Sequence, residues 1–321
     1  MKTVTSLPVV VLMILGISQG MQPSTGWTQA PATLTENPLQ GVVDFHVHSG
    51  PDSFTRSVTD LEIARIARAN GMGALVFKNH FTMTGDRAYL AELEVPGIRC
   101  YGGIVLNHAV GGLNPFAIER MVTFTGQRAK VVWLPTFDAL NHVKRFDAKR
   151  PGIAVVEKGK PVPELKAIFA LVAKHNLVLS TGHASSKEVL ILLEAARRAG
   201  VEQMLVTHAM ADPIRMSVSQ MKQAAMLGAK LECVWASNLQ GDGSHLPGMR
   251  LWKKVTTEDY AKAIRAVGVE HFILSSDLGQ YLNPLPTDGM KAFILELQSF
   301  GFSGSEIDLM CRKNPRTLLG F

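Results

Sequence analysis

The sequence predicts a single-domain α/β protein folded as a (β/α)₈ barrel, also called a TIM barrel. Three observations lead to this prediction. The 321-residue chain is 46% hydrophobic and 19% charged, the composition of a globular protein with a large core. From Gly41 onward, short apolar runs alternate with amphipathic segments of helical period. Eight such strand–helix units in about 280 residues match the usual size of one barrel.

The apolar runs that we interpret as strands are rich in Val, Ile, Leu and Ala, as expected of parallel strands that are buried on both faces. Polar residues follow them, which indicates where each strand ends. The predicted strands are 42–47, 73–78, 98–106, 130–135, 177–181, 204–207, 229–235 and 271–276.

Helix start and stop signals separate these strands. Ser57 and Thr59 precede the helical segment that begins at Asp60, and Gly71 stands in the place of a C-cap. The predicted helices are 60–70, 84–94, 114–124, 163–175, 186–199, 217–227, 256–267, 287–299 and 303–312. An open doubly wound sheet is the alternative fold. No Gly-x-Gly-x-x-Gly turn follows the first strand, which argues against a dinucleotide-binding version of it.

Residues 1–20 have the features of a signal peptide. Lys2 precedes an apolar run over residues 7–17, and residues 18–20 supply the small side chains that signal peptidases prefer. The apolar run is too short for a membrane-spanning helix. We therefore expect an exported protein, periplasmic or secreted, without stable membrane insertion after processing. A translation start at Met21 would instead leave the protein in the cytoplasm.

Residues 21–40 are polar, rich in Pro and Thr and without periodicity, so they are expected to form a linker before a barrel over 41–321. The three cysteines are odd in number and widely spaced, which excludes a disulfide framework and a Cys-x-x-Cys metal site. The net charge of +6 is spread along the chain, so nucleic acid is not an expected partner. A homo-oligomer remains open.

Four histidines and one aspartate stand where predicted strands end. His46 and His48 end the first strand, His183 follows the fifth, His208 follows the sixth and Asp277 ends the eighth. The carboxyl ends of barrel strands converge on one face, which is where active sites lie in this architecture. Residues two apart on a strand point the same way, so His46 and His48 can hold one ion together. Imidazole and carboxylate ligands predict a divalent metal, with Zn²⁺ first and Mn²⁺, Fe²⁺ or Ni²⁺ as alternatives.

This arrangement resembles the amidohydrolase superfamily, whose members carry His-x-His on strand one, histidines on strands five and six, and an aspartate on strand eight. The resemblance extends from about residue 41 to the end of the chain. Its local motifs here are Asp44-Phe-His-Val-His-Ser49, Thr181-Gly-His-Ala184, Val206-Thr-His208, Ser275-Ser-Asp277 and Asn314-Pro-Arg-Thr-Leu-Leu-Gly-Phe321.

The resemblance implies metal-dependent hydrolysis of an amide, lactam, lactone or ester bond in a small molecule. Metal-activated water would be the nucleophile, and Asp277 would act as general base and then pass the proton to the leaving group. A phosphoesterase on a similar barrel is the nearest alternative. An exported binding protein that keeps the metal without turnover, and a non-hydrolytic reaction of the superfamily, are further alternatives.

The chain departs from the superfamily pattern at the fourth strand. Binuclear members carry a carboxylated lysine there, whereas the lysine of this strand, Lys130, lies at the wrong end. The second strand ends in Phe77-Lys78-Asn79-His80, which places Lys78 and His80 at the active face instead. Lys78 is therefore a candidate metal ligand that bridges two ions after carboxylation. Alternatively, it is a cation that orients an anionic substrate beside a single ion.

Arg56, His80 and His108 are the candidates for substrate binding, because each lies in or beside a loop at the active face. Two long loops are candidate lids. The insertion 141–163 is strongly basic and would favour an anionic substrate, although solvated surface charge explains the same residues. The loop 237–255 combines glycines with a histidine and a tryptophan.

Overall fold

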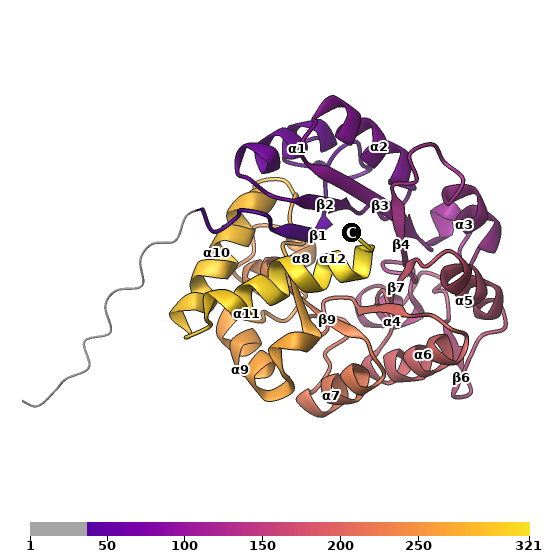
Figure 1. The fold of residues 1–321 in the computed structure, drawn as a ribbon. Coiled ribbons are helices and arrows are strands. Elements are labelled where there is room, and N and C mark those ends of the chain that lie inside the picture. The colour runs from indigo at the N-terminus through magenta and orange to yellow at the C-terminus, as the bar shows by residue number, and fades with distance from the viewer. Residues whose placement is uncertain (1–36) are drawn as a thin grey trace, which may run out of the picture. The chain divides into compact units, whose positions relative to one another are not determined.

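The computed structural model describes residues 37–321. Eight parallel strands form one sheet in the order β1-β2-β3-β4-β7-β8-β9-β10, and helices lie around them (Figure 1). The prediction of a (β/α)₈ barrel is confirmed. The strands are β1 (Val43–Val47), β2 (Ala74–Phe77), β3 (Arg99–Val105), β4 (Ala129–Trp133), β7 (Val178–Ser180), β8 (Gln203–Val206), β9 (Lys230–Val234) and β10 (Phe272–Ser275).

Backbone hydrogen bonds join the end of the first strand to the segment that follows the last one. The N–H of His48 donates to the carbonyl of Leu278 at 2.8 Å, and the N–H of Asp277 donates to the carbonyl of His46 at 2.9 Å. Gly279 permits this approach, because its φ is +123° and a Cβ there would lie 1.6 Å from the carbonyl oxygen of His48. The barrel therefore closes at the place where the predicted metal ligands His46 and His48 lie beside Asp277.

The helices begin at capping signals that the sequence shows. Five of them start with a complete capping box, in which the Ser or Thr cap and a side chain three residues later bond each other's backbone N–H. The helices that surround the strands are α1 (Asp60–Ala69), α2 (Gly85–Glu94), α3 (Pro115–Met121), α5 (Leu165–Lys174), α6 (Ser186–Arg198), α7 (Val218–Met226), α9 (Thr257–Val267), α10 (Pro286–Ser299), α11 (Gly304–Asp308) and α12 (Asn314–Leu319).

The C-terminal helical segment continues past residue 312, where the sequence predicted its end. After α11 the chain makes a π-helical turn at Leu309–Lys313 and goes on as α12. Pro315 lies in the first turn of α12, where the missing N–H of proline removes no helical hydrogen bond. The proline thus begins a new helix.

The core has two layers. The larger cluster packs strands against helices, and a smaller cluster takes alternate residues of the strands, including Phe45 and Trp133, which line the barrel interior. Leu318 and Leu319 of α12 join the interior cluster. Figure 1 shows α12 lying across the end of the barrel where the strands begin. The opposite end, where the strands terminate, is left for the site.

Both candidate lids contain regular structure. The insertion 141–163 holds α4 (Leu140–Phe146) and an antiparallel hairpin of β5 (Val156–Glu157) and β6 (Lys160–Pro161). The loop 237–255 contains the end of a 3₁₀ helix (Trp235–Leu239) and the short α8 (Pro247–Arg250).

The predicted signal peptide, and the predicted linker up to residue 36, lie outside the described residues. From residue 37 onward, no helix has the length and apolar composition needed to cross a membrane. All three cysteines, Cys100, Cys233 and Cys311, are buried free thiols, in agreement with the expectation that they form no disulfide framework.

Candidate metal centre

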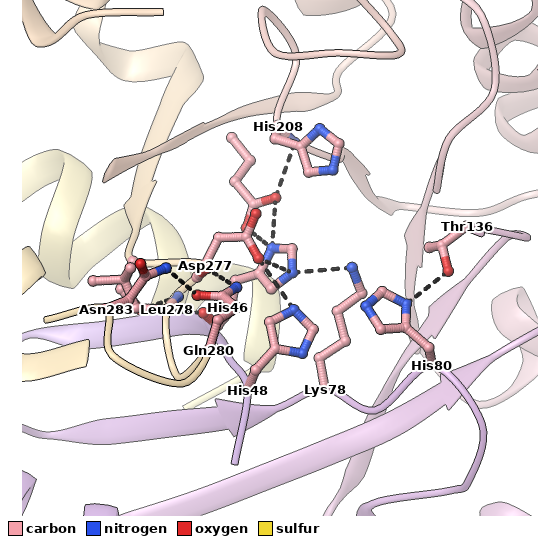
Figure 2. A network of polar contacts seen from close by, with 12 residues as sticks. His46, His48, Lys78, His80, Thr136, His208, Asp277, Leu278, Gln280 and Asn283 are labelled. Atoms are coloured by element: carbon pink, nitrogen blue, oxygen red, sulfur yellow. Dashed lines mark hydrogen bonds and ion pairs between the residues drawn. The ribbon is translucent and has the colours of Figure 1, made fainter. Parts of the chain in front are cut away.

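The structure brings His46, His48 and Asp277 together at the carboxyl end of the barrel. One carboxylate oxygen of Asp277, Oδ1, lies 3.1 Å from Nε2 of His46 and 3.1 Å from Nε2 of His48 (Figure 2). The three ligand atoms lie within 4.8 Å of one another, a grouping that can hold a metal ion. Both histidines are buried, and Asp277 is 14% exposed.

His183 and His208 form the second half of the site. Each follows the end of its strand, β7 or β8, and their Nε2 atoms lie 3.2 Å apart. The ring of His208 lies 6.2 Å from that of His46, so the two halves adjoin. The five residues predicted from the ends of strands one, five, six and eight thus share one site.

Two of these residues have strained backbones. Asp277 has a φ of +52° and His208 a φ of +23°, in the region that side chains other than glycine rarely adopt. Strain of this kind concentrates at active sites and ligand-binding positions, because elsewhere it only lowers stability. The conformation turns each chain sharply at the end of its strand, where the side chain enters the site.

Glu232 in β9 orients the first histidine, and sequence reasoning missed it. Both of its carboxylate oxygens lie 3.2 Å from Nδ1 of His46, and Oε2 also accepts the backbone N–H of His208 at 3.0 Å. A proton on Nδ1 of His46 then leaves the Nε2 lone pair free for a metal ion. The sequence feature that could have revealed it is a single acidic residue within an otherwise apolar predicted strand.

Lys78 is buried at the centre of the site. Its Nζ lies 3.0 Å from Nε2 of His46 (Figure 2), and 5.8 Å from the ring centroid of Trp133. Burial lowers the pKa of Lys78 to about 8, against the opposing attraction of Asp277 and Glu232. Lys78 and Asp277 therefore both lie beside Nε2 of His46.

The histidines of the site are neutral at pH 7. Burial lowers the pKa of His46 to about 3 and that of His208 to about 4. Burial also lowers the pKa values of His48 and His183 well below the ordinary range. Metal ligation requires neutral imidazole, so each ring is in the form that can bind.

The donor set fits a divalent metal ion. Zinc binds histidine nitrogen at about 2.0–2.1 Å, which puts two ligands of one tetrahedral ion roughly 3.3 Å apart. The separations of 3.1 Å at Asp277 and 3.2 Å between His183 and His208 are close to this value. The feature that does not fit is a positive charge on Lys78.

A cavity of about 550 Å³ opens onto this site. His48, Lys78, His183, His208 and Asp277 contribute to its wall. The rest of the wall is largely apolar and aromatic, and includes Phe54, Phe137, Phe146, Leu246, Met249, Leu251, Trp252 and Tyr281. Such a cavity suits a small, mostly apolar ligand.

The three predicted substrate-binding residues are placed differently. Arg56 and His80 line the cavity, whereas the exposed His108 does not. The side chain of Arg56 is 5% exposed and pairs with Asp52 at 2.7 Å. His80 has its Nδ1 2.9 Å from the hydroxyl of Thr136 and its ring stacked on Phe137 at a centroid distance of 4.0 Å.

The arginines of the basic insertion are paired and lie outside the cavity wall. Arg145 pairs with Asp212, and Arg150 pairs with Asp138. The same insertion contributes a residue that the sequence analysis did not single out. His142 of α4 lines the cavity, and its Nδ1 lies 2.8 Å from Nδ1 of His183.

Comparison with known proteins adds one sequence family. The model of the family of unknown function DUF6282 matches residues 41–232, which hold every candidate ligand except Asp277. A search of curated protein sequences found no significant match.

Solved structures show the same fold at low sequence identity. An organophosphate hydrolase engineered from a weak promiscuous lactonase has a TM-score of 0.57 at 14% identity, over 89% of this chain and 97% of that one. The organophosphorus hydrolase of Deinococcus radiodurans has a TM-score of 0.55 at 15% identity, over 88% and 94%. A protein of Pseudomonas putida proposed to be a 2-pyrone-4,6-dicarboxylic acid hydrolase has a TM-score of 0.58 at 14% identity, over 87% and 97%. The expected resemblance to barrel hydrolases is confirmed for the fold.

Proposed function

We propose that this chain, which belongs to the family of unknown function DUF6282, is a metal-dependent hydrolase of small, largely apolar molecules. The bond cleaved is an ester, lactone, lactam or amide. The observation that supports this most is the convergence of five donor side chains from four strand ends, four of which, His48, His183, His208 and Asp277, line one largely apolar cavity. A divalent ion held there, Zn²⁺ first, would make bound water acidic and polarise the bond to be cleaved.

Asp277 is the proposed general base. Its Oδ1 contacts both His46 and His48, and Asp277 lines the cavity, so its carboxylate reaches ligand and substrate together. It would take the proton of the attacking water and return it to the leaving group. The hydrogen bond from its N–H to the carbonyl of His46 holds the carboxylate in place.

Lys78 must lose its charge before a metal ion binds at His46. An ammonium 3.0 Å from the ligating nitrogen would repel a cation at that position. Carboxylation solves this, because the neutral amine adds CO₂ and releases one proton, and the product is an anionic oxygen ligand. We therefore propose that Lys78 ligates as a carbamate. Metal uptake that does not depend on dissolved CO₂ would contradict this role.

The substrate is proposed to be uncharged. Besides Lys78, Arg56 is the cationic side chain of the cavity wall, and Asp52 already neutralises it. The arginines of the basic insertion, whose charge in the sequence favoured an anionic substrate, form ion pairs away from the wall, and no lysine of the insertion lines the wall. Neutral phosphotriesters are the second candidate class, because they combine an uncharged apolar body with a hydrolysable centre, and two of the structures with this fold are organophosphate hydrolases.

Turnover by metal-loaded protein tests the function. The metal-free protein would be loaded with Zn²⁺, Mn²⁺ or Co²⁺ and assayed against neutral aryl esters, lactones, anilides and phosphotriesters. We expect turnover of at least one class, with a loss of 10²-fold or more in Asp277→Asn, since general base catalysis contributes roughly that much. Asp242→Asn, an exposed aspartate outside the cavity wall, is the control. Full metal occupancy without turnover of any class would favour a binding protein.

We also propose export, on the signal features of residues 1–20. Expression of the full chain in a bacterium with a periplasm, followed by mass determination of the mature protein, tests it. A mature chain that starts between residues 19 and 23 in the periplasmic fraction is expected. An unprocessed chain in the cytoplasm would contradict export.

A further inference from the structure

α4 is fastened to the second half of the site at two successive residues. The side chain of Asn141 donates to the carbonyl of His183 at 3.0 Å and to that of Pro213 at 3.3 Å. The next residue, His142, has its Nδ1 2.8 Å from Nδ1 of His183. The helix therefore holds both the backbone and the ring of a proposed metal ligand.

The two imidazoles are joined by a hydrogen bond between their Nδ1 atoms, which lie 2.8 Å apart. Their ring centroids are 4.8 Å apart and their planes are tilted by 24°. His142 is 7% exposed and His183 is 2% exposed, so water has little access to either nitrogen. One Nδ1 must carry the proton and the other must accept it.

Ligation fixes which nitrogen carries that proton. Nε2 of His183 lies 3.2 Å from Nε2 of His208, on the side where both would bind the ion. A neutral His183 with its Nε2 lone pair on a metal has its proton on Nδ1, and donates it to Nδ1 of His142. Neutral His142 then keeps its own proton on Nε2. His142 thus selects the ligating tautomer of His183.

The position of His142 depends on contacts along the same side of α4. Residues one turn further on, Arg145 and Phe146, contact Asp212 and Trp252 respectively. The helix is therefore fixed to the loops after β8 and β9, as well as to His183.

We propose that His142 is a positioning residue for metal binding, which holds the Nδ1–H tautomer of His183 and couples α4 to the ion at His183 and His208. This inference rests on the proposed function insofar as that function requires a metal at these residues. His142 acts through His183 and needs no contact with the ion.

Metal binding by the full chain tests the proposal. Metal-free wild type, His142→Leu and His142→Asn would be titrated with Zn²⁺ by calorimetry and with Co²⁺ by visible absorption. Loss of a partner of a ligating histidine typically weakens metal binding about 10–100-fold, and we expect this for His142→Leu. The asparagine oxygen can accept the Nδ1 proton, so His142→Asn should stay within about tenfold of wild type. His175→Leu, at the exposed histidine in the C-cap position of α5, should not change binding.

A double-mutant cycle separates positioning from general loosening. In a His183→Ala background, removal of His142 should cause no further loss of affinity, because its partner is already gone. The melting temperature of each metal-free variant checks its fold. Equal affinity of wild type and His142→Leu, or equal losses in the leucine and asparagine variants, would overturn the inference. So would a further loss in the His183→Ala background.

These outcomes are distinct from failure of the proposed function. If the protein binds metal with the expected dependence on His142 but turns over no substrate, the role of His142 is supported and the hydrolase function is refuted. If the protein turns over substrate but its metal affinity does not depend on His142, the hydrolase function is supported and the role of His142 is refuted. A wild-type protein that binds no divalent ion overturns both.

Discussion

The ring of Phe146 lies parallel to the indole of Trp252, with centroids 5.4 Å apart and planes tilted by 7°. The neighbouring residues are joined as well. Asp212 pairs with Nε of Arg145 at 2.8 Å and accepts the backbone N–H of Lys253 at 2.7 Å. The insertion 141–163 and the loop 237–255 are thus joined at adjacent points, and because Phe146 and Trp252 line the cavity, this junction forms part of its wall.

Asp212→Asn should loosen this junction. Asp212 is buried while Arg145 is 37% exposed, so solvent screening limits the loss to about 1–2 kcal/mol of unfolding free energy. Hydrogen exchange should accelerate in α4 and around Trp252 and stay unchanged in the strands. Glu194→Gln, which breaks an ion pair with both partners more than half exposed, is the control and should cost under about 0.5 kcal/mol. Unchanged exchange in α4 would refute the tie.

Glu232→Leu should weaken metal binding, because it removes the acceptor of the Nδ1 proton of His46. We expect a loss of about 10–100-fold in Zn²⁺ affinity by calorimetry. Glu232→Gln keeps one acceptor oxygen for two donors, so its loss should be smaller. The exposed Glu202→Gln serves as the control. If Glu232→Leu bound Zn²⁺ as tightly as wild type, the orienting role of Glu232 would be wrong.

Gly279→Ala should strongly destabilise the barrel. The new Cβ would meet the carbonyl of His48 at 1.6 Å on a backbone with positive φ, so the seam between β1 and the segment after β10 must open. A cost of roughly 3 kcal/mol or more is expected in urea unfolding. Gly243→Ala meets open space without a positive φ and should change stability by under about 0.5 kcal/mol. Similar midpoints for the two variants would contradict this account.

Glu306 should make stability depend on pH. The hydrogen bond from Arg265, together with the N–H of Ser303, lowers the pKa of Glu306 to about 2 from an ordinary value of 4.5. Its contribution is therefore complete above about pH 4.5 and disappears as the pH falls towards 2. Because Arg265 is 44% exposed, we expect about 1 kcal/mol. The stability difference between wild type and Glu306→Gln, measured by urea unfolding from pH 7 to 3, should shrink on acidification. A constant difference would refute the linkage.

Most of the fold could be predicted from local sequence patterns. Period and capping signals placed every barrel strand and the main helices around them, since each element reflects its own burial pattern and ends, whereas α4 and α8, inside the two candidate lids, were not predicted. The predicted ligands lie together because strand ends in a barrel share one face, so position along a strand is enough to predict proximity.

Residues that reach the site by tertiary packing escaped prediction. Glu232 lies inside a strand. The pairing of β8 with β9 brings it to His208, and the closure of the barrel between β1 and the segment after β10 brings it to His46. His142 reaches the site because Asn141 and Arg145 hold α4 against the segments that follow β7 and β8. His108 shows the reverse, since a loop histidine at the active face turned out to point to solvent.

The closure of the barrel at His46 and Asp277 has a consequence for biosynthesis. These residues are 231 positions apart, and both their backbones and their side chains meet only at the seam. A chain emerging from the ribosome presents His46 and His48 long before Asp277 has been made. The group of His46, His48 and Asp277 is therefore complete only after the final strand has joined the first, so an ion that needs all three side chains would bind after translation.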